Sequence, residues 1–431
     1  MSSQLRILLL GNGGREHTLA WKLAQSKLVD EIHVVPGNGG TAAVPKCRNV
    51  TSVSMDDHAA LVKYAASNNL NFLVPGPEAP LVAGVADYFK EHLPSMKCFG
   101  PSKTAAQMEG SKTFSKDFME RHSIPTAEFK NFDSYEEALK YVEVVPYNIV
   151  IKADGLAAGK GVILPQNLDE AKAALKEIML DKEFGDAGSS VVIEECLEGP
   201  EVSILSLSDG TSILSLPPAQ DHKRIGDGDT GPNTGGMGTY APTPLVSKAQ
   251  LDEIDRTVLQ PTIDGMKAEG FPFCGCLFTG LMLTERGPKV LEYNVRFGDP
   301  ESQSCLPLLK SDLAELFVAA CDGTLASKKV EISSDSSCTV VVAAGGYPGS
   351  YAKGTPMKVG SPNEQDGVYV FHAGTTLTGE GQWKTSGGRV IAATATGATL
   401  KEAVDKAYKG VGLIEFEGMQ YRKDIAHRAL K

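Results

Sequence analysis

Short apolar runs that stop at glycine or proline alternate with longer amphipathic stretches over the first hundred residues. Residues 6–10 predict a buried strand, 11–17 a glycine-rich turn, and 18–26 a helix. Further strands are expected at 31–35 and 71–74, the second running into a proline-rich loop. Because strands and helices alternate, this region should form a mostly parallel sheet with ligand loops at the carboxyl ends of its strands.

The pattern changes beyond residue 104. An amphipathic helix is predicted over 104–122 and a small α/β unit over 125–195, with helices at 135–142 and 170–180. Strands are then expected near 128 and at 147–151, 190–195, 202–207, 213–216, 277–283 and 289–293. A final unit opens with the apolar stretch 338–344 and continues through 387–391. The segment 226–244 is dense in Gly, Pro, Asp and Thr and is predicted to be a loop.

These changes predict a multidomain chain of mixed α/β and α+β class. An N-terminal α/β domain with ligand loops is expected over 1–105, and a connecting helix over 106–124. Two subdomains are expected at 125–195 and 196–328, followed by a small C-terminal domain at 329–431. A chain of 431 residues has ample length for such a division.

Composition narrows the class of protein. The net charge of −11 disfavours a nucleic-acid-binding surface, so an anionic substrate would have to be captured by local positive charge. Eight cysteines are scattered without a CxxC pair, which is typical of reduced thiols rather than a disulfide framework or a zinc site. We find neither a signal-peptide pattern nor an apolar stretch of membrane-spanning length, and therefore expect a cytosolic protein without a membrane partner.

The glycine-rich segment 152–162 is the most informative stretch. It follows a strand-like run and contains Lys152, Gly159, Lys160 and Gly161. Backbone amides of such a loop can face phosphate oxygens while the lysines supply charge. The glycine spacing does not fit a Walker A motif, so we interpret the segment as a phosphate-covering loop. A flexible surface loop is the alternative.

A second informative segment is 291–301. Glu292 and Asn294 lie two apart on a predicted strand, so their side chains project from one face and offer two oxygen ligands for a nucleotide-bound Mg²⁺. Arg296 lies on the same side, where it could meet an anion. A solvated ion pair between Glu292 and Arg296 is the alternative interpretation.

A dinucleotide-binding interpretation of the first turn fails at two positions. Glu16 stands where the third glycine of G-x-G-x-x-G is required, and the second strand ends without the expected acidic residue. The turn can still bind phosphate at its helix N-terminus, with Arg15 adding charge. Histidines such as His17 and His222 are more often structural hydrogen-bonding residues than catalysts, and we find no Ser-His-Asp order.

Five segments taken together resemble the phosphoribosylamine–glycine ligase family of the ATP-grasp superfamily. They are 11–17, 152–162, 220–224, 231–238 and 296–301, and they occur in the family's order over essentially the whole chain. The resemblance implies a pre-ATP-grasp domain, a two-subdomain ATP-grasp fold and a C-terminal domain. It also implies ATP as co-substrate and Mg²⁺ or Mn²⁺ as cofactor.

The resemblance further implies a role for individual residues. Lys112 and Lys152 should contact the nucleotide phosphates, and Glu201 the ribose. Glu292 and Asn294 should hold the metal. The backbone of a hinge formed by Glu194, Glu195, Cys196 and Leu197 should read the adenine edge. The remaining implied nucleotide contacts are Gly159, Lys160, Gly161 and Lys223. The implied substrate contacts are Gly13, Gly14, Arg15, Glu16, Asn233, Gly235, Gly236 and Arg296, with Arg296, Lys152 and Asp221 as the catalytic set. Many relatives carry a further acidic ligand on the preceding strand, but 277–283 contains none.

The implied reaction joins glycine to 5-phosphoribosylamine through a glycyl phosphate, with ATP converted to ADP and phosphate. It requires no side-chain nucleophile, because positioning and charge neutralisation dominate phosphoryl transfer. In animals this ligase is fused to other purine-pathway enzyme domains, so the chain could be the first part of a longer protein. The alternatives are another ATP-grasp ligase or carboxylase of purine metabolism, a dinucleotide-dependent oxidoreductase, and an inactive binding module.

Overall fold

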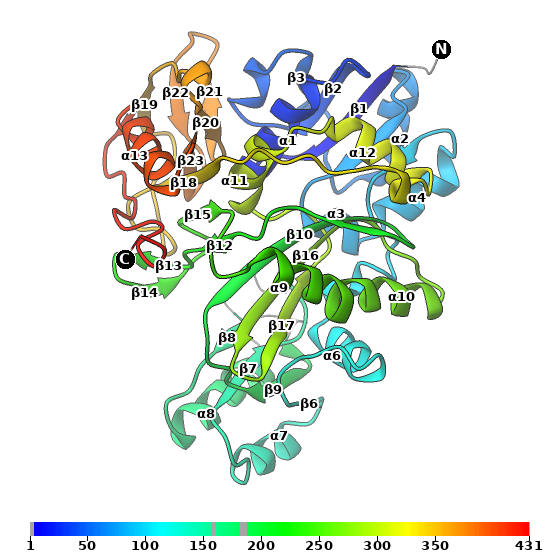
Figure 1. The fold of residues 1–431 in the computed structure, drawn as a ribbon, viewed down its shortest axis with the longest axis vertical. Helices are drawn as coiled ribbons and strands as arrows, with labels where there is room; N and C mark the ends of the chain where they lie inside the picture. The colour runs from blue at the N-terminus through cyan, green and yellow to red at the C-terminus, as the bar shows by residue number, and fades with distance from the viewer. Residues whose placement is uncertain (1–3, 157–160, 182–187, 431) are drawn as a thin grey trace.

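The N-terminal unit contains the predicted parallel sheet (Figure 1). The computed structural model describes residues 4–156, 161–181 and 188–430. The sheet has the order β3-β2-β1-β4-β5. Its strands are β1 (Leu5–Gly11), β2 (Val29–Pro36), β3 (Cys47–Asn49), β4 (Phe72–Pro75) and β5 (Lys97–Cys98). They are connected by α1 (Gly14–Ala24), η1 (Thr41–Ala43), α2 (His58–Ser67), α3 (Glu78–Val82) and α4 (Val85–His92).

The first helix begins four residues earlier than predicted. The prediction placed its start at Thr18, whereas α1 starts at Gly14. The backbone N–H of Gly13 donates to Glu16 Oε2 at 2.6 Å, so a side chain inside the helix satisfies its first turn. The residue that breaks the dinucleotide pattern is therefore the one that caps the helix.

The unit predicted at 125–195 is a four-stranded antiparallel sheet covered by helices, at the lower end of Figure 1. The sheet order is β6-β9-β7-β8. Its elements are β6 (Phe129–Phe132), α7 (Tyr135–Val142), β7 (Ile149–Ala153), β8 (Val162–Ile163), α8 (Leu168–Leu175), η2 (Lys176–Leu180) and β9 (Val191–Glu195). Its buried side chains form a hydrophobic cluster within 132–193, separate from those of the other units. This unit, called the lid below, thus has its own core.

The central unit is built on the antiparallel sheet β11-β10-β16-β17. Its strands are β10 (Glu201–Asp209), β11 (Ile213–Ser215), β16 (Cys274–Thr284) and β17 (Gly287–Asn294). Its helices are α5 (Gln107–Gly110), α6 (Lys112–Arg121), α9 (Lys248–Ile254), η4 (Asp255–Leu259), α10 (Gln260–Ala268), α11 (Glu301–Leu308), α12 (Leu313–Cys321) and η5 (Leu325–Ser327). The prediction of one helix over 104–122 is wrong, because Ser111 adopts an extended backbone and caps α6 by accepting the N–H of Phe114.

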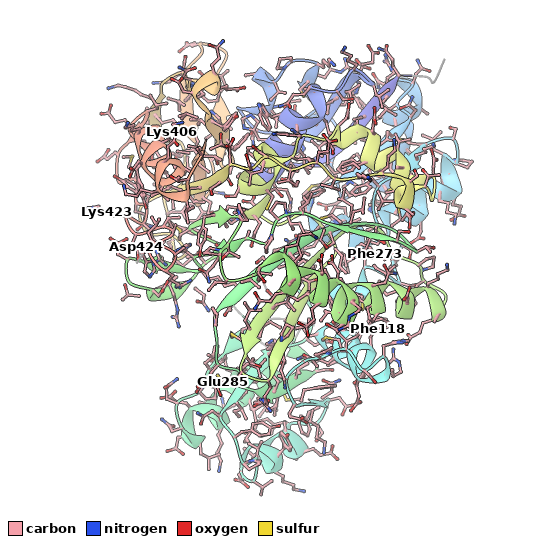
Figure 2. All side chains as sticks on the ribbon, in the orientation of Figure 1. Phe118, Phe273, Glu285, Lys406, Lys423 and Asp424 are labelled. Atoms are coloured by element: carbon pink, nitrogen blue, oxygen red, sulfur yellow. The ribbon has the colours of Figure 1, made fainter. Side chains whose placement is uncertain are left out.

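Two hydrophobic clusters join the central unit to the N-terminal unit. One lies on the β1 face that carries Leu8 and Leu10 and extends to α6, α10 and β16; the other includes Ile7 and Leu9 and extends to α12. Phe118 and Phe273, both labelled in Figure 2, are fully buried in the first cluster. The N-terminal and central units therefore form one packed body, whose core is separate from that of the lid.

The C-terminal unit contains an antiparallel sheet to which two earlier segments contribute. Strands β12 (Gln220–Asp221) and β15 (Gly238–Ala241) precede β18 (Ser336–Ala343), β23 (Arg389–Gly397) and β20 (Val368–His372) in the sheet order. The other elements are β19 (Pro356–Val359), η6 (Glu364–Asp366), β21 (Thr375–Leu377), β22 (Trp383–Thr385), α13 (Leu400–Val411) and β24 (Ile414–Phe416). In the described part of the chain, no helix is both long and apolar enough to cross a membrane.

The prediction that 226–244 is a loop is wrong. It holds the second strand of the hairpin β13 (Arg224–Gly226) and β14 (Thr230–Asn233), and also β15, which pairs with β18. The hairpin is fastened to the C-terminal tail by the fully buried Arg422, which ion-pairs with Asp229 and Asp424 at 2.9 and 2.8 Å. Figure 2 labels Lys423 and Asp424 at this junction. Contacts made far along the chain thus order a glycine-rich segment.

Candidate functional site

A cleft lies between the lid and the central unit. About 820 Å³ of atom-free space, which includes open solvent, lies between its walls. Its walls are Glu78, Met108, Glu109, Lys112, Ser115, Lys116, Met119, Lys152, Gly155, Leu156, Gly161, Val162, Leu291, Glu292, Tyr293, Asn294 and Arg296. Six residues predicted from the sequence meet here: Lys112, Lys152, Gly161, Glu292, Asn294 and Arg296.

The two predicted phosphate lysines reach this cleft from different elements. Lys112 is the first residue of α6, and its ammonium donates to the carbonyl of Gly155 at 2.8 Å. Lys152 lies on β7, where its ammonium ion-pairs with Glu194 and donates to the carbonyl of Leu291 at 3.2 Å. Burial lowers the pKa of Lys112 although Glu292 lies close by. Both ammonium groups are held by protein oxygens that nucleotide phosphates could replace.

The first end of the glycine loop is bound to α6. Asp154 accepts hydrogen bonds from Ser111 Oγ and from the backbone N–H of Thr113, both at 3.1 Å. Its carboxylate thereby occupies the N-terminus of α6, where negative charge is favoured. The predicted contacts Gly159 and Lys160 lie outside the described residues. The loop that should cover phosphates therefore begins beside the helix that carries Lys112.

The predicted adenine hinge lies behind the cleft wall. The backbone N–H groups of Glu195 and Cys196 donate to the carbonyls of Glu128 and Asn148, at 2.8 and 2.7 Å. The Glu195 carboxylate ion-pairs with Arg286. Leu197 is buried, and the Glu194 side chain turns inward to two lysines. Within the described residues, none of these four hinge positions lines the cleft, and their adenine role stays a prediction.

The predicted metal ligands Glu292 and Asn294 face the cleft from β17. The neighbouring strand β16 places Gly280 opposite Glu292 and Phe278 opposite Asn294, so the facing positions carry no oxygen ligand. Burial alone would raise the pKa of Glu292, but the positive charges of Lys223, Lys152 and Lys112 outweigh it and lower that pKa. The side chain is still 42% exposed and can be reached from the cleft.

This donor set suits a cation shared with a ligand. Among the described residues, no group of three or more His, Cys, Asp or Glu side chains is placed to hold a metal. One ionised carboxylate and one amide oxygen fit Mg²⁺, which keeps several waters and takes further oxygens from phosphates.

Arg296 is held in the cleft by partners that sequence reasoning missed. Its guanidinium ion-pairs with Glu109 at 2.9 Å and Glu78 at 3.2 Å, and it donates to Asn294 Oδ1 at 3.1 Å. Glu109 also accepts the backbone N–H of Val295 at 2.7 Å. Glu78 is the first residue of α3, in the proline-rich segment after β4. The position of this segment at the carboxyl end of a parallel strand was the available signal. Nothing comparable in the sequence marked Glu109 or the buried Lys116 as functional residues.

The Gly13–Glu16 turn forms a separate cluster around Asp299. Arg15 ion-pairs with Glu16 and donates to the carbonyl of Phe297, while its backbone N–H donates to Asp299 Oδ2 at 3.2 Å. Gly14 lies in the same turn, against Gln303. Carboxylates of the protein thus satisfy much of the positive character of this turn.

The hairpin segment supplies the remaining predicted residues. Arg389 ion-pairs with Asp299 at 3.5 Å and donates to the carbonyls of Gly235 and Gly236 at 2.7 and 3.4 Å, whereas Asn233 is exposed at the end of β14. Burial and the nearby Glu301 raise the pKa of Asp221 well above its ordinary value.

Lys223 connects this segment to the cleft. It ion-pairs with the predicted ribose ligand Glu201 at 2.9 Å and approaches Glu292 at 4.0 Å. Asp221 and Lys223 therefore lie between the cleft and the cluster around Asp299.

A cleft between the sheet of a lid and the sheet of a central unit is typical of the ATP-grasp class of enzymes. Solved structures share this fold. The biotin carboxylase domain of a Hydrogenobacter thermophilus 2-oxoglutarate carboxylase has a TM-score of 0.74 at 16% identity, over 97% of this chain and 92% of that one. The phosphoribosylamine–glycine ligase of Thermotoga maritima has a TM-score of 0.85 at 33% identity, over 98% and 100% of the two chains.

Sequence comparison identifies the family. Models of the phosphoribosylglycinamide synthetase N domain, ATP-grasp (A) domain and C domain match residues 5–109, 110–302 and 337–428. A phosphoribosylamine–glycine ligase of Salmonella typhi is 50% identical over 99% of both chains. The chain belongs to the phosphoribosylglycinamide synthetase family.

Some relatives are longer than this chain. A bifunctional purine biosynthetic protein of Schizosaccharomyces pombe is 55% identical over 98% of this chain but only 53% of its own length. A trifunctional purine biosynthetic protein of Homo sapiens is 51% identical over 99% of this chain and 42% of its own. The chain spans about half the length of these curated relatives.

Proposed function

We propose that the chain joins glycine to 5-phosphoribosylamine, using ATP and giving glycinamide ribonucleotide, ADP and phosphate. The observation that carries this proposal is the cleft, in which Lys112 and Lys152 face Glu292, Asn294 and Arg296. Cations for phosphates, oxygen ligands for a divalent metal and an arginine for a carboxylate are what activation of an amino acid by ATP requires.

The reaction has two steps, phosphorylation of glycine and attack by the amine. A carboxylate oxygen of glycine attacks the γ-phosphorus of ATP, the bond to ADP breaks, and glycyl phosphate forms. The amine of phosphoribosylamine then attacks the glycyl carbonyl, phosphate leaves, and the amine loses a proton. Positioning of the reactants and neutralisation of phosphate charge accelerate the reaction. Closure of the lid excludes water that would hydrolyse the acyl phosphate.

We assign Lys112, Lys152 and the glycine loop to the phosphates, and Glu201 to the ribose of ATP. Glu292 and Asn294 would hold Mg²⁺ or Mn²⁺, which neutralises phosphate charge when bound. Glu292 would supply the ionised ligand, because neighbouring lysines keep its pKa low.

We assign Arg296 to the glycine carboxylate and the Gly13–Glu16 turn to phosphoribosylamine. Arg296 stands beside the metal ligands, whereas the turn lies by Asp299 and Arg389. Arg296→Ala should therefore abolish positional isotope exchange in ATP with glycine alone, and Arg15→Ala should spare it. The reverse pattern would exchange the two assignments.

The experiment that tests the activity is a coupled ADP-release assay with glycine and freshly made phosphoribosylamine, with mass spectrometry of the product. ADP release that requires both acceptors, together with glycinamide ribonucleotide as product, supports the proposal. ADP release that requires bicarbonate or another amine would favour another ligase or carboxylase of purine metabolism.

We also propose that the chain acts in the cytosol and that further purine-pathway domains are fused to it in the native protein. The described cysteines are free thiols, as expected in a reducing compartment. The half-length match to bifunctional and trifunctional relatives supports a fusion. The intact mass of the native protein shows directly whether further domains are fused to the chain.

A further inference from the structure

A buried carboxylate lies between two lysines behind the cleft. Glu194 on β9 is 2% exposed, Lys116 on α6 is 3% exposed and Lys152 on β7 is 8% exposed. One oxygen of Glu194 meets the Lys152 ammonium, and its other oxygen meets the Lys116 ammonium. The three side chains therefore carry one excess positive charge, and all three are buried.

The two lysines are anchored differently. Lys116 donates to Thr126 Oγ1 at 2.7 Å, and that hydroxyl donates to the carbonyl of Val290 at 2.6 Å. This chain of hydrogen bonds fixes Lys116 to the central unit. Apart from Glu194, Lys152 has one longer hydrogen bond, of 3.2 Å, to the carbonyl beside Glu292. Lys152 is thus the ammonium group that is freer to leave.

Glu194 requires a positive partner at all times. Burial alone would raise its pKa, but Lys152 and Lys116 outweigh burial and lower that pKa, so the group is a carboxylate. A buried ion pair that loses one partner is strongly destabilised, because the remaining charge is left without solvent or counter-ion. If Lys152 moved to a phosphate with no second lysine present, this penalty would oppose nucleotide binding.

We propose that Lys116 is a positioning residue: it is the resident counter-ion of Glu194, which allows Lys152 to leave that carboxylate for the nucleotide phosphates. The inference rests on the phosphate role of Lys152 in the proposed function. It assigns no contact between Lys116 and the ligand, although Lys116 also lines the cleft.

The test is calorimetric titration with Mg-ADP, which needs neither turnover nor acceptor. It is run at pH 7, below the pKa of Lys116, which burial lowers to about 8. Lys116→Met should weaken binding on the order of tenfold, because Lys152 becomes the sole partner of Glu194. The double variant Lys116→Met with Glu194→Gln should recover to within about threefold of wild type, because nothing charged then retains Lys152. Lys172→Met, which removes an exposed lid lysine paired with Glu143, is the matched control.

Each alternative gives a different result. If Lys116 contacted the nucleotide directly, the double variant would bind as weakly as Lys116→Met, and this outcome overturns the proposal. If Lys116 served only folding, the double variant would also lose binding and would melt at a lower temperature, which equally refutes the proposal.

Two further variants keep the test decisive if Lys116→Met does not fold. The adenine contact predicted for Glu194 is made by its backbone, which glutamine retains. Glu194→Gln alone must therefore bind Mg-ADP as tightly as wild type or more tightly, and weaker binding contradicts the inference. Lys152→Met is measured in parallel: unchanged affinity there would reject the phosphate role of Lys152, and thus the proposed function at that residue.

Discussion

Replacing His222 by glutamine separates the hydrogen bonds of a buried histidine from its titration. His222 is fully buried; its Nδ1 lies 3.2 Å from the carbonyl of Gly238, and its Nε2 accepts the backbone N–H of Ala426 at 3.1 Å. Only the neutral ring with its proton on Nδ1 satisfies both contacts. Burial, together with the positive charges of Arg422 and Arg428, lowers the pKa of His222 to about 3.

The size of the effect on stability follows from the coupling between proton binding and folding. An unfolded histidine has a pKa of about 6.5, so the unfolded chain binds a proton here as pH falls from 7 to 5, whereas the folded chain does not. Folding stability is therefore lost as pH falls through the unfolded pKa toward the folded one. This single residue should remove about 2 kcal/mol of unfolding free energy between pH 7 and pH 5.

The assay is urea denaturation at pH 7 and pH 5, followed by circular dichroism. A glutamine amide can donate to Gly238 and accept from Ala426, so His222→Gln should cost about 1 kcal/mol or less at pH 7. Its loss of stability between pH 7 and pH 5 should be about 2 kcal/mol smaller than that of wild type. The exposed His92→Gln is the matched control and should keep the wild-type loss. An equal loss in wild type and His222→Gln would refute a buried neutral ring.

Three further outcomes are expected. Lys152→Met should lower turnover on the order of a hundredfold or more, with little change in melting temperature because Lys116 still pairs with Glu194; wild-type turnover in a folded variant would contradict the phosphate role. Glu292→Gln should weaken binding of Mg-ADP while sparing ADP measured with a chelator, and equal losses under both conditions would place the metal elsewhere. Arg422→Met should cost about 2–3 kcal/mol in thermal denaturation, because two aspartates lose a buried partner; Arg428→Met, which removes a more exposed partner of Asp229, should cost less than about 1 kcal/mol.

The elements that were predicted correctly are those determined by residues within or next to the element itself. The helix over 135–142 has the predicted bounds, because Ser134 caps it by accepting the N–H of Glu137 and its apolar face repeats at helical spacing. The strand predicted at 6–10 lies within β1 for the same kind of reason, since an apolar run ends at a glycine. The break at Ser111 was also visible in principle, because a serine after Gly110 is a signal for a new helix start.

Elements whose cause is distant were not predicted. Strand β15 pairs with β18, about a hundred residues later, and β14 is an exposed strand that contains Gly231 and Pro232. The residues in and around β14 and β15 do not indicate this pairing. The site follows the same division: Glu292 and Asn294 could be placed by their spacing, whereas Lys116 and Glu109 are single charged residues whose partners lie far along the chain.

The shared sheet also sets an order of events during synthesis. Strand β15 leaves the ribosome well before its partner β18, since the segment between Ala241 and Ser336 must be made first. At roughly 5–20 residues per second that interval lasts about 5–20 s. Throughout it the edge of β15 has backbone groups without their final partner, which is the condition under which strands pair with other chains. A nascent chain halted before β18 would therefore carry an unpaired strand edge next to the incomplete segment 231–238. Newly made protein depends on the C-terminal unit, which begins with β18, to complete that segment and to cover that edge.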